Sequence, residues 1–146
     1  MVATVDPTYR RGLHPLHAVL LAGTVPLFLG ALLSDIAYAR TYNVQWTNFA
    51  SWLIVGGLVF GTVVLVLALV DLFRRGHGVA HRRGRQVIYF LLVLATWVLA
   101  LVNALVHGKD AWAVMPGGLV LSVVVFLLAC AATWLGFAGY RAGGAA

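Results

Sequence analysis

Charge and cysteine are scarce in this chain of 146 residues, and glutamate is absent. Charged residues make up 10% of the sequence, hydrophobic residues make up 62%, and the mean hydropathy is +0.97. An ordinary soluble domain carries about 25% charged residues, so this composition excludes a soluble globular enzyme and a disordered chain. The lone Cys130 excludes an internal disulfide and a zinc finger. No Ser-His-Asp spacing, phosphate-binding glycine loop or His-Glu-x-x-His motif is present, so hydrolytic catalysis has no support.

Four long apolar runs fill most of the chain. They cover about residues 17–38, 49–72, 87–107 and 114–138. A helix that crosses the hydrocarbon core of a bilayer needs about 20 apolar residues, and the runs lack the alternation of a membrane β-strand. The connections are short, which favours antiparallel neighbours. We therefore predict one domain over residues 1–146, an all-α integral membrane protein folded as an antiparallel up-down four-helix transmembrane bundle.

The basic residues predict the orientation of this bundle. Cytoplasmic loops of membrane proteins carry the excess of Lys and Arg. Arg40 and Lys109 would lie on one side, and the other eight basic residues would lie on the side of both termini: Arg10, Arg11, Arg74, Arg75, Arg82, Arg83, Arg85 and Arg141. We predict a bacterial cytoplasmic (inner) membrane protein with both termini inside. The net charge of +6 then indicates contacts with anionic lipids of the bilayer and no nucleic acid.

The first run also has features of a secretory signal peptide. Arg10-Arg11 precede it and Ala37-Tyr38-Ala39 offers a small-x-small cleavage site. The uninterrupted apolar stretch from Ala18 to Leu33 is long for a signal peptide and contains Pro26, so we expect a retained span.

Polar and small residues gather on one face of each predicted helix. Helices in a bilayer associate through small residues and interhelical hydrogen bonds, so we expect these faces to point inward. At 100° per residue, the faces are His14, His17, Thr24 and Asp35; Gly57, Gly61, Ala68 and Asp71; Gln86, Tyr89, Thr96, Asn103 and His107; and Met115, Gly118, Ser122, Ala129, Thr133, Gly136 and Tyr140.

The histidines suggest two kinds of site at the predicted cytoplasmic end. Imidazole is a common ligand of haem and of transition metals. In the first interpretation His14 or His17 and His77 or His81 are axial ligands of a b-type haem, and arginines such as Arg74 and Arg82 contact its propionates or lipid headgroups. In the second, His14, His17 and Asp71 bind a transition-metal ion directly, together with a loop histidine.

Simpler roles remain open for the same residues. His14 and His17 can cap the first helix, and His77 and His81 can belong to a headgroup-binding loop. Asp71 can pair with Arg74 or Arg75, which follow at helical spacing. Asp35 can reach outward or bond to Asn103 or Lys109.

Several segments together resemble a bacterial family of small membrane proteins catalogued as a domain of unknown function. The resemblance covers about residues 13–140 and rests on these pieces: His14-Pro15-Leu16-His17, Pro26, Asp35, Gly56-Gly57 with Gly61, Asp71, Asn103, His107, Asp110, Trp112, Pro116, Ser122, Trp134 and Gly136. The family is similar in layout to the two-haem transmembrane cytochromes, which implies a four-helix fold and haem as a possible cofactor. The chain departs from that pattern at Ile88-Tyr89-Phe90 and after Phe137, where further histidines would be expected.

Three functions follow from the sequence. The first is binding of b-type haem at the cytoplasmic end for electron transfer. The second is a non-catalytic accessory or structural subunit of a larger membrane complex, or a homo-oligomer. The third is binding of a transition metal.

Overall fold

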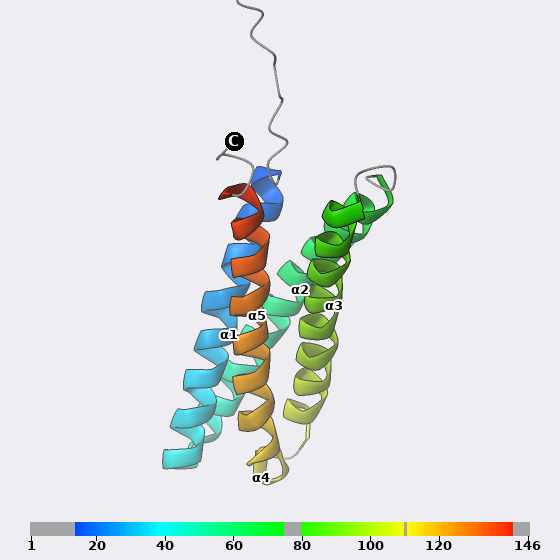
Figure 1. Cartoon of the computed structure of the whole chain (residues 1–146). Helices are drawn as coiled ribbons and strands as arrows, with labels where there is room; N and C mark the ends of the chain where they lie inside the picture. The colour runs from blue at the N-terminus through cyan, green and yellow to red at the C-terminus, as the bar shows by residue number, and fades with distance from the viewer. Residues whose placement is uncertain (1–13, 75–79, 110, 142–146) are drawn as a thin grey trace, which may run out of the picture.

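The computed structural model describes residues 14–74, 80–109 and 111–141; for residues 80–83, 111–112 and 139–141 it describes only the backbone. The described residues form helices and short connections and contain no strand. Four long helices stand side by side with a short helix at one end (Figure 1). Their bounds are α1 Pro15–Thr41, α2 Val44–Arg74, α3 Ala80–His107, α4 Ala111–Val114 and α5 Gly117–Arg141. The all-α prediction is confirmed.

Local signals explain where these helices begin and end. His14 is the N-cap of α1, its Nδ1 accepts from the N–H of Leu16 at 3.3 Å, and Pro15 supplies the first helical residue. Tyr42 ends α1 in the left-handed conformation, with φ of 54°. Asn43 directly precedes α2, and its side-chain oxygen accepts from the N–H of Gln45 at 3.0 Å.

The predicted fourth run is divided in the structure. Sequence reasoning started this span at residue 114, whereas the short α4 ends at Val114 and α5 begins at Gly117. Pro116 has no N–H to donate inside a helix and lies in the break, where its carbonyl accepts from Val120 at 3.2 Å.

Each long helix has two long neighbours. α1 packs on α2 and α5, and α3 packs on the same two helices, so α1 and α3 lie diagonally opposite. The chain runs up and down through α1, α2, α3 and α5, which makes α1 and α3 parallel (Figure 1). The four long helices are each apolar and long enough to cross a membrane. The up-down bundle predicted from the short connections agrees with these contacts.

Buried positions recur at alternating spacings of four and three, as in the heptads of packed helices. Leu21, Val64, Val93 and Ala132, one residue from each long helix, form one apolar layer. A second layer contains Phe28, Ala100, Val125 and Ala129. The inward faces predicted from helical periodicity are therefore largely correct, although Gly57 accommodates the ring of Phe28 rather than a neighbouring backbone.

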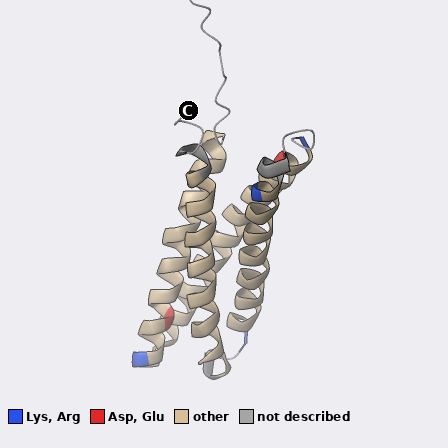
Figure 2. Cartoon of the chain, viewed as in Figure 1, with Lys and Arg blue, Asp and Glu red and all other residues tan. Residues whose placement is uncertain are grey.

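Charged residues are confined to the two ends of the bundle, and the middle is free of them among the described residues (Figure 2). Large apolar side chains such as Val59, Leu105 and Leu127 are more than half exposed on the outer faces. Exposed apolar faces around an interior that encloses the polar groups are what a bilayer requires of a helical bundle. We name the two ends after their buried histidines, the His17 end and the His107 end.

Candidate functional site

Asp35 and His107 meet inside the bundle at the His107 end. Asp35 lies on α1 and is fully buried, and His107 closes α3. The Nε2 of His107 lies 2.8 Å from Oδ1 of Asp35, and neither side chain has any exposed surface. The sequence offered Asn103 or Lys109 as partners of Asp35, and this expectation is wrong. His107 is the partner because residues 35 and 107 lie at the same depth on diagonal helices.

The second ring nitrogen of His107 is also engaged. Its Nδ1 lies 2.9 Å from the carbonyl oxygen of Asn103, one turn earlier in α3. A carbonyl can only accept, so Nδ1 carries a hydrogen. The short contact between Nε2 and Oδ1 then contains one proton, held by the imidazole or by the carboxyl group.

Ser122 and Asn103 complete the network. Ser122 on α5 donates to Oδ2 of Asp35 and accepts from Nδ2 of Asn103 at 2.9 Å. Three helices therefore converge on one carboxyl group. Gly118 makes room for this arrangement, because a Cβ there would lie 2.9 Å from Cε1 of His107 and 2.6 Å from Cγ1 of Val114.

An open polar depression of about 490 Å³ lies above this network, at the start of α2. His107 forms part of its wall through the backbone, since the imidazole itself is buried. The depression is lined by the amides Asn43, Gln45 and Asn48, the hydroxyls Thr47 and Ser51, and Lys109. Two buried oxygens at this end have no hydrogen-bond partner, Oγ1 of Thr47 and Oδ1 of Asn103.

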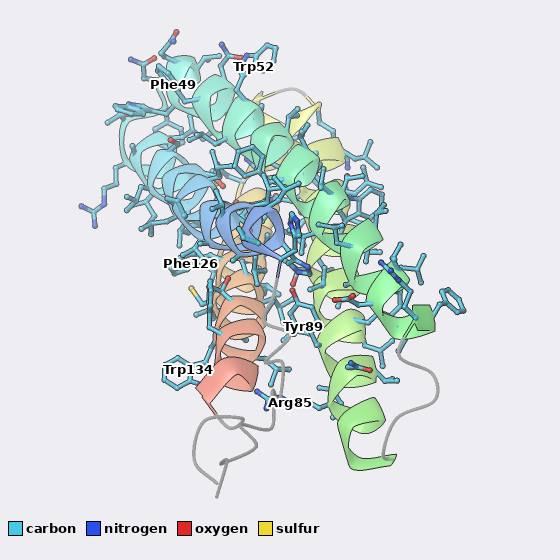
Figure 3. All side chains as sticks on the ribbon, turned by 90° about the horizontal axis from the view of Figure 1, so that it is seen from above. Phe49, Trp52, Arg85, Tyr89, Phe126 and Trp134 are labelled. Atoms are coloured by element: carbon cyan, nitrogen blue, oxygen red, sulfur yellow. The ribbon has the colours of Figure 1, made fainter. Side chains whose placement is uncertain are left out.

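A second polar pair lies at the His17 end. Nε2 of the buried His17 on α1 lies 2.7 Å from the hydroxyl of Tyr89 on α3. Gly136 leaves space for Tyr89, and Arg85 donates to the carbonyl of Leu135 near the end of α5 at 3.3 Å. Tyr89 and Arg85 lie at the end from which Figure 3 views the bundle. The sequence placed Tyr89 on the inward face but not as the partner of His17.

The structure separates the two histidines of the first turn. The spacing of three predicted that His14 and His17 share one face, but His14 is the exposed N-cap and His17 is buried. The spacing rule applies only to helical residues, and the N-cap has an extended backbone with ψ of 136°. The capping role that the sequence allowed is confirmed for His14.

The remaining predicted ligands either lie apart from one another or have side chains outside the described part of the structure. Asp71 is half-buried and Arg74 is exposed near the end of α2. His77 lies outside the described residues, and His81 and Arg82 are described only by their helical backbone. Among the described side chains, no group of three or more His, Cys, Asp or Glu residues could hold a metal ion. The set His14, His17 and Asp71 is therefore not brought together.

The space beside His17 does not fit a porphyrin inside the bundle. Nε2 of His17 already bonds to Tyr89, and the apolar layer of Leu21, Val64, Val93 and Ala132 packs the interior beyond it. The interior cavity between the apolar layers has a volume of about 20 Å³, enough for about one water molecule.

Four apolar helices with exposed hydrocarbon faces and buried hydrogen-bonded pairs define a polytopic membrane protein. The sequence profile of the family described as Predicted membrane protein (DUF2231) matches residues 13–142, and the chain belongs to that family. The family resemblance drawn from the sequence is thus confirmed, while the likeness to two-haem cytochromes is not. No curated protein and no solved structure matches the chain.

Proposed function

We propose that this protein is a non-catalytic binding protein of the membrane, and that its binding site is the polar depression at the His107 end. One observation carries the proposal: an open, hydrogen-bonding depression lies directly above a buried network that fixes its wall. Ligand sites in proteins are typically concave, with a few convergent polar groups on a rigid support.

The buried network acts as that support. Asp35 is hydrogen-bonded to two other helices, to His107 of α3 and to Ser122 of α5, so the backbone of His107 is held in place from below. The side chains of the buried network do not face the depression. They are positioning residues, which hold its wall in place. A buried charged or polar group in a membrane helix is costly and is commonly retained for function.

Ligand-induced stabilisation tests the proposal, because a solute that binds only the folded state raises the unfolding temperature. Purified protein in dodecyl maltoside is heated with a panel of solutes: inorganic phosphate, succinate, choline and a disaccharide. We expect at least one solute to stabilise the protein. Asn48→Trp, which fills the depression, should remove this effect, and Asn48→Ala should keep it. If no solute acts on the wild-type protein, the proposal is overturned.

We also propose that the His17 end faces the bacterial cytoplasm and that the His107 end faces outward. The support is the distribution of Arg and Lys, eight of which flank the His17 end in the sequence, with only Arg40 and Lys109 at the other. Arginines at the His17 end would then meet anionic lipids of the inner leaflet. Reporter fusions at residue 110 and at the C-terminus test this orientation; a periplasmic C-terminus would contradict it.

A b-type haem at the His17 end is the second candidate function. The observation that favours it is a buried imidazole, His17, at the end that carries most arginines. The haem would require Tyr89 to release His17 and the adjacent helices to separate. A Soret band in the purified protein that disappears in His17→Ala would support it; a colourless wild-type preparation would exclude it.

A further inference from the structure

The depression at the His107 end has the chemical character of a site for negative charge. Among its described lining residues there is one cation, Lys109, and no carboxylate. The other polar groups are amides and hydroxyls, which donate hydrogen bonds as readily as they accept them. Among these described residues a metal cation would find no charged oxygen, whereas an oxyanion would meet a positive charge and several donors.

The start of α2 adds to this positive character. The unpaired N–H groups at the beginning of a long helix carry a partial positive charge, which favours bound anions. α2 is 31 residues long, and its first turn contains no acidic residue that would compensate this charge. Asn43 caps only one of these N–H groups with its side chain, that of Gln45.

Thr47 is an independent observation that points to a ligand. Thr47 belongs to the lining of the depression and is only 7% exposed, and its Oγ1 is buried without a hydrogen-bond partner. A rotation of this side chain would turn the hydroxyl toward a bound ligand. Helical threonines commonly donate to the carbonyl four residues earlier, as Thr96 does to Leu92. For Thr47 that carbonyl belongs to Asn43, outside the helix, and it accepts from the N–H of Trp46. Burial of an unpartnered hydroxyl is unfavourable, and a bound acceptor would relieve it.

We propose that the depression binds a phosphate-type oxyanion through the ammonium group of Lys109, the hydroxyl of Thr47 and the N-terminus of α2. This inference rests on the proposed binding function and specifies its ligand class. The oxyanion can be a free phosphate or the phosphate of a lipid headgroup. Phe49 and Trp52 project outward from the same end of α2 (Figure 3), and exposed aromatic side chains of this kind settle at the headgroup level of a bilayer.

Binding assays in a phosphate-free sugar detergent test the inference. The full-length protein in dodecyl maltoside is titrated with sodium phosphate, with sodium chloride as the salt control, and separately with short-chain phosphatidylglycerol. Lys109→Gln and Thr47→Val should each weaken binding about tenfold, since each removes one of the groups proposed to donate to the anion. Arg40→Gln, a cation at the same end outside the lining, and Thr96→Val, a buried threonine elsewhere, are the matched controls and should leave the affinity unchanged.

The outcomes separate the sources and the two proposals. Binding of inorganic phosphate supports a free anion, and binding of phosphatidylglycerol alone supports a headgroup, provided Lys109→Gln and Thr47→Val weaken either. No binding of phosphate or phosphatidylglycerol overturns the inference. Equal loss in Arg40→Gln, or no loss in Thr47→Val, also overturns it, because attraction would then be unspecific. If choline or a disaccharide binds instead and Asn48→Trp abolishes it, the oxyanion inference fails while the proposed binding function stands.

Discussion

Asp35 and His107 are 72 residues apart in the sequence and share a hydrogen bond across the diagonal of the bundle, and the same separation joins His17 to Tyr89. Leu21 and Val93, and Phe28 and Ala100, share apolar layers at that spacing too. α1 and α3 therefore run parallel in one register over about 27 Å, the length of 18 helical residues. Polar pairs at both ends fix this register, since a slip would leave His17 and Asp35 without their partners.

Breaking the Asp35–His107 pair should destabilise the bundle. Asp35→Ala or His107→Ala is expected to lower the free energy of unfolding by about 3–5 kcal/mol, because the remaining partner stays buried without its hydrogen bond. Titration with sodium dodecyl sulfate in dodecyl maltoside measures this loss. His14→Ala, at the exposed N-cap, is the control for a histidine outside the core. If the double variant Asp35→Ala/His107→Ala costs as much as both single losses added, the two residues are not coupled.

Gly118 should be intolerant of a side chain. Gly118→Ala places a methyl group against the ring of His107 and is expected to cost about 1–3 kcal/mol through overpacking. The neighbouring Gly117→Ala provides the control, because nothing lies within 4 Å of a Cβ there. The same denaturant titration compares the two variants. Equal stability of the two alanine variants would show that α5 does not pack this closely on His107.

The hydroxyl of Tyr89 should contribute to stability only through His17. Tyr89→Phe is expected to cost about 0.5–1.5 kcal/mol, the net value of a typical hydrogen bond. In a His17→Phe background the same change should cost nothing further. Thermal unfolding of the four proteins measures this coupling, and an identical cost of Tyr89→Phe in both backgrounds would contradict the bond.

Two threonine-to-valine changes should act in opposite directions. Thr47→Val removes a buried hydroxyl that has no partner and is expected to raise the free energy of unfolding by about 1 kcal/mol in phosphate-free detergent. Thr96→Val removes a hydroxyl bonded to Leu92 at 2.7 Å and should lower it. A loss of stability in Thr47→Val would mean that its hydroxyl is already satisfied in the ligand-free protein.

Much of the fold follows from periodicity alone. Runs of apolar residues long enough for a bilayer, and polar faces at helical spacing, predicted the four-helix bundle and placed Asp35, Asn103, His107 and Ser122 on inward faces. Periodicity orients a residue on its own helix but does not give the depth and neighbour order that decide which residues meet. The pairing of Asp35 with His107 required the parallel, diagonal arrangement of α1 and α3. A usable signal existed in the recurrence of polar residues 72 positions apart, at residues 17 and 89, 24 and 96, and 35 and 107.

The histidines show a second limit of sequence reasoning. The sequence predicted four of them near one end, which suggested a shared cofactor, but His14 is exposed and His17 is turned inward to Tyr89. Clustering along the chain said nothing about the direction of each imidazole. The depression at the start of α2 was not predicted either, since its lining comes from a connection and a first turn with no periodic pattern.

The two apolar layers between the buried polar pairs make the described interior an electrical insulator. A chain of water molecules or side chains able to relay protons cannot pass Leu21, Val64, Val93 and Ala132 without parting the helices.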